Sequence, residues 1–224
     1  KAFKCPVLVA NDVDAGVYGE YALGAARKAR CVLGVFPGTG IGGGCVYEGR
    51  IFRGSERSCL EIGHMQVLPG GPRCGCGRRG CLEAVASRLA ISAEAAKAVF
   101  RGQAPHLMER AGMNLADIRS GALAASIKEG DTAIELIVRD AARWLGVGIA
   151  NVVNLIAPDC IVLGGGLVEA MPDLYLSEVE KTVRETAMSS LRKTFKLTIG
   201  KLGDDAIVMG AAAWARAAAG GRAK

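Results

Sequence analysis

No stretch of this 224-residue sequence is apolar over the roughly 18–20 residues that a membrane-spanning helix needs. The most apolar long segment, residues 144–157, is interrupted by Asn151 and Asn154. A signal peptide, internal repeats and low-complexity linkers are not visible either. We therefore expect a cytoplasmic protein without a membrane partner, long enough for one large domain or two small ones.

Neither sign of charge is strongly concentrated, and aromatic residues make up only 5% of the chain. The net charge is +6, the basic residues are scattered, and their densest group is Arg73, Arg78 and Arg79. This balance permits nucleic-acid binding without favouring it, so we expect no nucleic acid partner and some attraction for anionic substrates. Half of the residues are hydrophobic, which indicates a globular protein with a real core.

Histidine is scarce too, with 2 in the chain, yet one of them shares a short segment with three cysteines. His64, Cys74, Cys76 and Cys81 are separated by glycine-rich turns that allow a sharp backbone path. Three thiols and one imidazole make a closed tetrahedral set, which is typical of structural zinc. The alternative is three buried thiols beside an unrelated core histidine.

The remaining cysteines do not suggest disulfides, because most of them lie in apolar, strand-like surroundings. We expect them to be buried free thiols in a reducing compartment. They are Cys5, Cys31, Cys45, Cys59 and Cys160.

A glycine-rich turn, residues 38–44 (GTGIGGG), follows an apolar strand pattern. Its backbone N–H groups are free to approach phosphate oxygens, and Thr39 adds a hydroxyl. No GK[ST] follows, so it is no Walker loop, and a strand rather than a helix follows, so it is no dinucleotide-binding fingerprint. A turn that only joins two hairpin strands is the open alternative.

Two pairs of polar residues are further candidates. Asn11 and Asp12 follow the apolar run at residues 7–10, and Asp12 could accept a proton from a substrate hydroxyl as a general base. The alternative is an N-cap for the helix expected to begin at residue 13. Glu61 and Glu83 flank the metal-like segment and could bind sugar hydroxyls, or be ordinary surface glutamates.

Strands alternate with helices along the chain, which predicts the α/β class. We expect strands at residues 7–10, 31–36, 45–47, 51–52, 160–163 and 195–202. We expect helices at residues 13–29, 82–101, from 114, 131–156, 172–188 and 205–218.

Taken together and in this order, the motifs resemble the ROK family of sugar kinases and sugar-responsive repressors. The matching segments, which span the whole chain, are residues 11–12, 38–44, 61–64, 74–83, 151–154, 161–166 and 203–206. Within the family, EIGHM and CLEAVASR look most like the glucokinase branch.

The resemblance implies an actin-like (ribonuclease H-like) ATPase fold with sugar in an interlobe cleft. It makes Asp12 the base for the 6-hydroxyl of a hexose, most often glucose, and implies that ATP and Mg²⁺ are required. Substrate binding would fall to Asn11, Asp12, Glu61, His64 and Glu83, with His64 also on zinc. Nucleotide binding would fall to Gly38, Thr39, Gly40, Gly164, Gly165 and Gly166. Family members are usually dimers or tetramers, so we expect a homodimer or homotetramer.

The sequence departs from the family pattern in two places. The DxGGT phosphate loop of the amino-terminal lobe is not found, so we expect this chain to be a piece of a longer protein. Residues 1–12 would be the remnant of the amino-terminal lobe. Residues 13–224 would be the carboxyl-terminal lobe, with its zinc loop at residues 61–83. Asp14 also stands where the family usually has Asn, and its charge would perturb Asp12.

Three functions remain open at this stage. The first is a hexose kinase. The second is a sugar-sensing repressor with a helix-turn-helix outside this chain, although a pure sensor needs neither Asp12 nor the turn at 38–44. The third is a non-catalytic sugar-binding module, which the absent phosphate loop favours.

Overall fold

Five strands form one sheet, in the order β3-β2-β1-β4-β5, in the computed structural model, which describes residues 7–55 and 59–220. The strands are β1 (Cys31–Pro37), β2 (Ile41–Tyr47), β3 (Arg50–Ile51), β4 (Cys160–Leu163) and β5 (Lys196–Ile199). β1 pairs antiparallel with β2 and parallel with β4, and β4 pairs parallel with β5. The carboxyl ends of β1, β4 and β5 therefore meet at one edge of the sheet.

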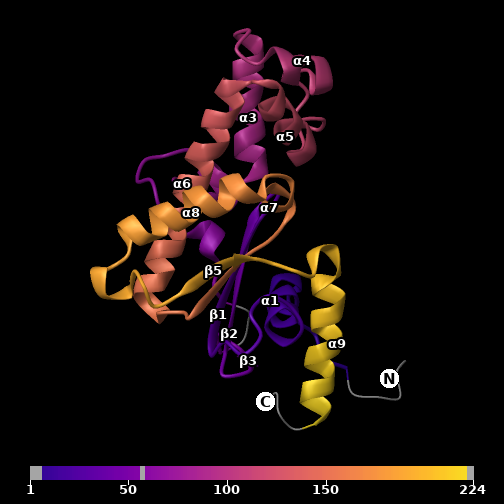
Figure 1. The fold of residues 1–224 in the computed structure, drawn as a ribbon, viewed down its shortest axis with the longest axis vertical. Coiled ribbons are helices and arrows are strands. Elements are labelled where there is room, and N and C mark those ends of the chain that lie inside the picture. Colours follow the sequence, from indigo (N-terminus) through magenta and orange to yellow (C-terminus); the bar gives the residue numbers. More distant parts are fainter. Residues whose placement is uncertain (1–6, 56–58, 221–224) are drawn as a thin grey trace.

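Helices cover both faces of this sheet (Figure 1). They are α1 (Asp12–Ala22), α2 (Leu82–Ala86), α3 (Arg88–Phe100), α4 (Pro105–Ala111), α5 (Ser120–Glu129), α6 (Thr132–Ile156), α7 (Gly166–Ala170), α8 (Pro172–Thr186) and α9 (Ala206–Ala219). α1 and α9 pack side by side on one face, and α6 and α8 pack together on the other. In the part of the chain that is described, no helix is long and apolar enough to cross a membrane.

The side chains of each strand alternate between the two faces, as the two-residue period of a strand requires. Val32 and Val162 join the cluster beneath α1, whereas Leu33 and Ile161 join the larger cluster beneath α6 and α8. Strands buried on both faces read as continuous apolar runs, which is why the segments around β1 and β4 could be recognised in the sequence.

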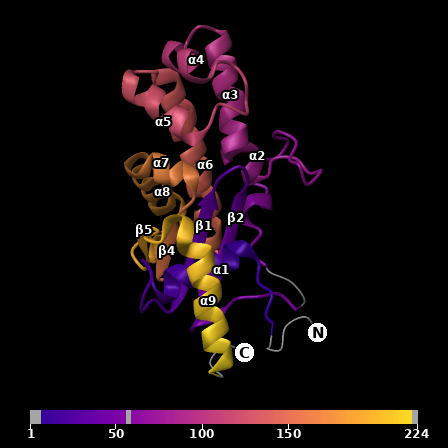
Figure 2. The ribbon, with the colours of Figure 1, turned by 90° about the vertical axis from the view of Figure 1, so that its right-hand side faces the viewer.

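A group of helices stands beyond the carboxyl ends of the parallel strands. Figure 2 shows α3, α4 and α5 at this end, with α6 reaching up from the side of the sheet to join them. α7 lies between them and the sheet and contacts both α5 and β1. The edge of the sheet where ligands gather in α/β proteins is thus enclosed by helices.

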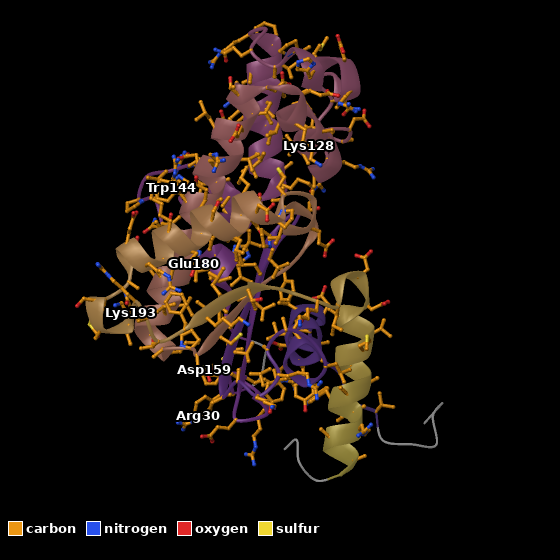
Figure 3. All side chains as sticks on the ribbon, in the orientation of Figure 1. Arg30, Lys128, Trp144, Asp159, Glu180 and Lys193 are labelled. Carbon is orange, nitrogen blue, oxygen red and sulfur yellow. The ribbon has the colours of Figure 1, made fainter. Side chains whose placement is uncertain are left out.

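At the opposite end of the sheet, the carboxylate of Asp159 links the starts of β1 and β4 by hydrogen bonds. Asp159, just before β4, accepts hydrogen bonds at 2.8 Å from the backbone N–H groups of Arg30 and Cys31, just before and at the start of β1. Figure 3 shows Arg30 and Asp159 close together at this end. This link aligns the starts of the two central parallel strands.

The structure confirms several sequence predictions. The α/β class, the strands at 31–36 and 160–163, the long helix ending before Pro158, and the final helix are all present. The predicted hairpin is also present, with Glu48 and Gly49 between β2 and β3. Cys31, Cys45 and Cys160 are buried free thiols as expected, Cys59 is partly exposed, and Cys5 lies outside the described residues.

The predicted buried strand at residues 7–10 is wrong. These residues form no strand, and Val7 and Val9 are 63% and 83% exposed. An apolar run becomes a buried strand only when another strand pairs with it and a layer covers it, and no described segment does so here.

Several boundaries also differ from the predictions, among them the strand expected at 195–202, which is Lys196–Ile199. The helix expected at 13–29 begins at Asp12 and ends at Ala22, and the strand expected from residue 45 begins at Ile41. The helix expected at 82–101 divides at Ser87, whose side chain caps α3 by accepting from the N–H of Ala90 at 3.3 Å. The helix expected from residue 114 is a turn, because the Asn114 side chain accepts from the N–H of Ala116, and α5 begins only at Ser120.

Candidate active site and metal centre

A cavity of about 330 Å³ lies at the carboxyl edge of the sheet, against the start of α1. It brings Asp12 together with the glycine turn that follows β4. These parts of the chain are far apart in sequence, so only the fold places them in one site. The residues that line it are Asp12, Val13, Gly16, Glu20, Phe36, Gly164, Gly165, Gly166, Glu169, Ile199, Gly200, Gly203, Asp204, Ala206 and Ile207.

The sequence left open whether Asp12 caps the helix or has a free carboxylate, and the structure gives the N-cap position to Asn11. Asn11 is the N-cap of α1, and its Oδ1 accepts from the N–H groups of Val13 at 2.8 Å and Asp14 at 3.4 Å. Asp12 is the first residue of the helix, is exposed, and accepts from the N–H of Val13 through Oδ1 at 2.9 Å. Among the described residues, no hydrogen bond engages its second oxygen, Oδ2. The N-cap of α1 is thus Asn11 and not Asp12.

Asp14 points elsewhere. Residues two apart in a helix lie on different sides of it, and Asp14 is only 1% exposed while Asp12 faces solvent. A Cβ on Gly44 of β2 would lie 3.2 Å from Asp14 Oδ1, so this carboxylate packs against the sheet. The extra acid that departs from the family pattern lies outside the lining of the cavity of Asp12.

The glycine turn after β4 requires glycine for steric reasons. Gly165 has φ +84°, and a Cβ there would lie 2.9 Å from the carbonyl oxygen of Pro37 at the end of β1. A Cβ on Gly164 would meet the ring of Phe36 at 2.6 Å. The turn therefore presents bare backbone to the cavity, as a nucleotide site needs.

Glu20 lines the cavity and was not among the predicted site residues. This buried carboxylate of α1 accepts hydrogen bonds from the N–H groups of Lys201 and Leu202 through Oε1, both at 2.8 Å. Oε2 accepts from the N–H of Ala25 at 2.7 Å. Glu20 thus ties the segment after β5, which lines the cavity through Gly200, to the helix that carries Asp12. A glutamate within an expected helix offered no signal of this contact.

The first glycine turn is held by helix α3. The N–H of Gly38 donates to the carbonyl of Gly40 at 2.8 Å, which closes a tight turn between β1 and β2. Arg88 donates from its backbone to the carbonyl of Gly38 at 2.8 Å and from Nη2 to Thr39 Oγ1 at 2.6 Å. Gly42, Gly43 and Gly44 belong to β2 rather than to the turn, so the phosphate-binding candidate narrows to residues 38–40.

The four predicted metal ligands converge. One ligand atom from each of His64, Cys74, Cys76 and Cys81 lies within 4.8 Å of all the others. Cys76 Sγ and Cys81 Sγ are 3.7 Å apart, and Cys74 Sγ is 3.6 Å from His64 Nδ1. A tetrahedral zinc ion with Zn–S of about 2.3 Å and Zn–N of about 2.0 Å places two sulfurs about 3.8 Å apart and a sulfur and a nitrogen about 3.5 Å apart. The donor set fits zinc in both chemistry and spacing, and the sulfurs are too far apart for disulfides, which need about 2.0 Å.

The thiols of this cluster are unequal. The backbone N–H of Arg78 stabilises the Cys76 thiolate and lowers the pKa of Cys76 to about 6. Burial raises the pKa of Cys81 to about 11. Of these two thiols Cys76 therefore ionises first, and a bound cation would draw the remaining protons off.

Glu83 connects the metal cluster to the first glycine turn. Its Oε2 accepts from the N–H of Ile41 at 3.2 Å, and its Oε1 lies 3.7 Å from Cys74 Sγ. A Cβ on Gly40 would lie 2.5 Å from Oε2, so a side chain there would displace this carboxylate. The metal-like loop is therefore in direct contact with the candidate phosphate turn.

Three of the five predicted sugar ligands, Glu61, His64 and Glu83, lie apart from Asp12. Glu61 is exposed and immediately precedes the short 3₁₀ turn Ile62–His64, while His64 and Glu83 are half-buried. None of the three lines the cavity of Asp12. The structure thus joins Asp12 to Gly164, Gly165 and Gly166, and joins Glu83 and His64 to the metal cluster. Glu169 and Asp204, which also line the cavity, were not predicted as site residues, although the GDDA motif at 203–206 was a signal for the second.

Comparison with known proteins identifies the family of this chain. Residues 1–218 match the sequence model of the ROK family. A glucokinase of Halalkalibacterium halodurans is 36% identical over 213 residues, which cover 92% of this chain and 62% of that protein. A xylose repressor of Caldicellulosiruptor bescii is 27% identical over 208 residues, which cover 93% of this chain and 51% of that protein.

Among solved structures, a ROK family glucokinase from Streptomyces griseus in complex with glucose and AMPPNP superimposes with a TM-score of 0.83. It is 30% identical, and the match covers 96% of this chain and 70% of that one. The predicted actin-like fold is confirmed by this likeness. The chain spans only about 62% of the length of the H. halodurans protein.

Proposed function

The chain belongs to the ROK family, and from this premise we propose that it forms the catalytic lobe of a hexose kinase. The reaction would transfer the terminal phosphoryl group of ATP to the 6-hydroxyl of a hexose, with glucose as the first candidate. The observation that carries the proposal is the shared cavity of Asp12 and the glycine turn at 164–166. A base and a nucleotide-binding turn that face one cavity are what phosphoryl transfer requires.

We assign Asp12 as the general base. Its Oδ1 is held by the N–H of Val13, so the carboxylate has a fixed orientation and Oδ2 can accept the proton of the sugar hydroxyl. Asn11, which caps α1 through Oδ1, keeps its side-chain N–H₂ group to donate to a neighbouring hydroxyl. Mg²⁺ would accompany the ATP phosphates and neutralise charge on them.

We assign the phosphate side of the site to two glycine turns. Gly38, Thr39 and Gly40 would contact the transferred phosphoryl group, and Gly164, Gly165 and Gly166 the rest of the nucleotide. Gly166 lies on the lining of both the cavity of Asp12 and the adjoining cavity of Thr39. A donor that lies across Gly166 would reach from one glycine turn to the other.

We propose that His64, Cys74, Cys76 and Cys81 hold one structural zinc ion. Such an ion would fix the backbone of the loop and leave His64 Nε2 free to meet a sugar hydroxyl beside Glu61 and Glu83. Elemental analysis of the purified protein should find one zinc per chain. Cys76→Ser should lower that ratio well below one, and a full zinc content in this variant would exclude the assignment.

We retain two further expectations as proposals. Residues 1–12 would be the last part of the amino-terminal lobe, and residues 13–224 would form the carboxyl-terminal lobe. This boundary falls after the first residue of α1, which begins at Asp12. Light scattering after size exclusion should give the mass of a dimer or tetramer, and a monomeric mass would end that expectation.

The test of the kinase is ADP release by the protein expressed from its full open reading frame, with ATP, Mg²⁺ and a panel of hexoses. Because general-base catalysis typically supplies about 10²–10⁴-fold in rate, Asp12→Asn should lower turnover by that factor. Asp173→Asn, an exposed aspartate at the start of α8, is the matched control and should keep full turnover.

A sugar-sensing repressor is the second candidate, supported by the likeness to the xylose repressor. It predicts sugar-dependent thermal stabilisation with no ADP release from any hexose. That combination would replace the kinase proposal.

A further inference from the structure

A second cavity of about 580 Å³ lies on the other side of Gly166, between the first glycine turn and the starts of helices α3 and α5. Its lining includes two arginines and no acidic residue. The residues are Thr39, Arg88, Leu89, Leu115, Ala116, Arg119, Ser120, Gly121 and Gly166.

Arg88 enters this cavity from the first position of α3. Its Nη2 donates to Thr39 Oγ1 at 2.6 Å, and this contact fills an acceptor site of the hydroxyl. A threonine hydroxyl has one donor and two acceptor sites, so this contact leaves its own proton unused. The remaining N–H groups of the guanidinium, which has five, are likewise available.

Arg119 enters the cavity from the N-cap position of α5. Its Nε donates to the carbonyl of Ala116 at 3.1 Å, which anchors the base of the guanidinium and leaves its end free. Among the described residues, no ion pair includes Arg88 or Arg119, whereas Arg110, Arg139, Arg143 and Arg184 each pair with a glutamate. Two cations that share a cavity without a carboxylate repel each other until an anion lies between them.

We propose that Arg88 and Arg119 bind the polyphosphate chain of the phosphoryl donor, with Arg88 as a specificity-determining residue that also orients the Thr39 hydroxyl towards it. A guanidinium presents paired N–H groups that match phosphate oxygens, which makes arginine well suited to this role. The identity of the anion as a phosphoryl donor rests on the proposed kinase function. Leu89, Leu115 and Ala116 add an apolar wall to the same cavity.

The phosphoryl donor could be a nucleotide or an inorganic polyphosphate, and binding measurements with three probes distinguish the two. Titration calorimetry of the full chain would use ATP, inorganic tripolyphosphate and adenosine. Binding of both ATP and tripolyphosphate identifies the cavity as a polyphosphate site, and tighter binding of ATP assigns it to a nucleotide donor. Binding of adenosine alone, or of none of the three, would overturn the proposal.

Arg88→Gln removes the charge and keeps most of the side-chain length. Loss of a charged hydrogen bond should weaken the binding of ATP and of tripolyphosphate by about 10- to 100-fold and leave adenosine unaffected. Arg88→Lys keeps the charge without the paired N–H groups, so its affinity for ATP and tripolyphosphate should lie between that of the wild type and that of Arg88→Gln. Arg101→Gln is the matched control, because this exposed arginine caps the other end of α3, about 20 Å away.

A purely structural role for Arg88 predicts a different pattern. If the side chain only ties the turn to α3, Arg88→Gln would weaken adenosine and tripolyphosphate equally and lower the melting temperature, and this would overturn the proposal. Salt provides a further readout, since screening weakens charge pairing. The affinity of the wild-type chain for tripolyphosphate should fall steeply with added salt, and that of Arg88→Gln less steeply.

Failure of this inference is distinguishable from failure of the kinase proposal. If hexose-dependent ADP release persists in Arg88→Gln with an unchanged KM for ATP, the inference is wrong and the kinase stands. If tripolyphosphate binding needs Arg88 but no hexose is phosphorylated, the anion site stands and the kinase is wrong. The expected result is a raised KM for ATP with an unchanged KM for the hexose.

Discussion

The two faces of the sheet are held together in different ways. The face beneath α6 and α8 is packed by bulky side chains, among them Leu145 and Ile149, both 0% exposed. The face beneath α1 is packed by a smaller cluster, and α1 meets α9 through glycines. A Cβ on Gly210 would lie 1.7 Å from the carbonyl oxygen of Ala15, and one on Gly19 would lie 2.5 Å from that of Ala206.

The difference matters because the proposed base lies on the second face. Side-chain packing tolerates small shifts, since neighbouring side chains can relax, whereas two backbones in contact have no flexible atoms to move. α1 is therefore held at one distance from α9, and Asp12 at its start is placed with it. We infer that the α6 face supplies most of the stability and that the α1–α9 contact supplies the position of the base.

The largest effect is expected in the α6 face. Leu145→Ala should lower the free energy of unfolding by about 2–5 kcal/mol, because it removes buried methyl groups and leaves a cavity. Urea denaturation measures the loss. Leu155→Ala, on the same helix but 77% exposed, is the control and should change stability by less than about 0.5 kcal/mol. Equal losses in the two variants would contradict the assignment of the core to this face.

The next effect is expected between α1 and α9. Gly210→Ala should lower the free energy of unfolding by about 1–3 kcal/mol, because the added methyl group overlaps the backbone of α1. It should also lower turnover, since α1 must shift and carries Asp12. Gly220→Ala, at the carboxyl end of α9, is the control, because the nearest atom to a Cβ there lies at 3.6 Å, which is an ordinary van der Waals contact. A Gly210→Ala variant as stable and as active as this control would show that the two helices are not in backbone contact.

A smaller effect of the opposite sign is expected at Tyr175, inside the α6 face. Its hydroxyl is buried, has no hydrogen-bond partner among the described residues, and has its pKa raised by burial. Tyr175→Phe should leave stability unchanged or raise it by up to about 1 kcal/mol, because a desolvated polar group is removed. Thermal denaturation tests this. A loss above about 1 kcal/mol would mean that the hydroxyl is bonded.

The smallest of the expected effects is the ionisation of one thiol, Cys76, in the metal loop. The pKa of Cys76 is lowered to about 6, so in protein stripped of metal its alkylation should rise through that pH and level off above it, since the thiolate is the reactive form. Mass spectrometry after iodoacetamide treatment measures the rate for each thiol. Cys160, whose pKa is raised by burial, is the internal control and should stay unreactive.

Zinc sharpens the same experiment. A bound cation should suppress alkylation of Cys76 and release the protons of the other thiols, so metal affinity should fall as the pH falls. Alkylation of Cys76 with a midpoint near pH 9, or without protection by zinc, would argue against the cluster.

Several features of the site follow from local sequence. The ligand types and spacings of the metal loop predicted a cluster that the structure assembles, because glycines confine four ligands to one short loop. β1 and β4 were readable because strands covered on both faces are continuously apolar. The run at residues 7–10 has the same pattern and is exposed, which shows that composition indicates a strand only when a partner strand is present.

Other features arise only in three dimensions. Asp12 and Gly164 lie far apart in the sequence and line one cavity, because β1 and β4 run parallel and α1 packs across them. Arg88 meets Thr39, and Glu20 holds the segment after β5, through contacts that no local pattern encodes. The sequence by itself determined the candidate metal ligands and the glycine turns, since these depend on residue type and spacing, and it indicated the candidate base through the resemblance to the ROK family. The tertiary structure alone decided which of them face one another, since that depends on strand order and on the distance between packed helices.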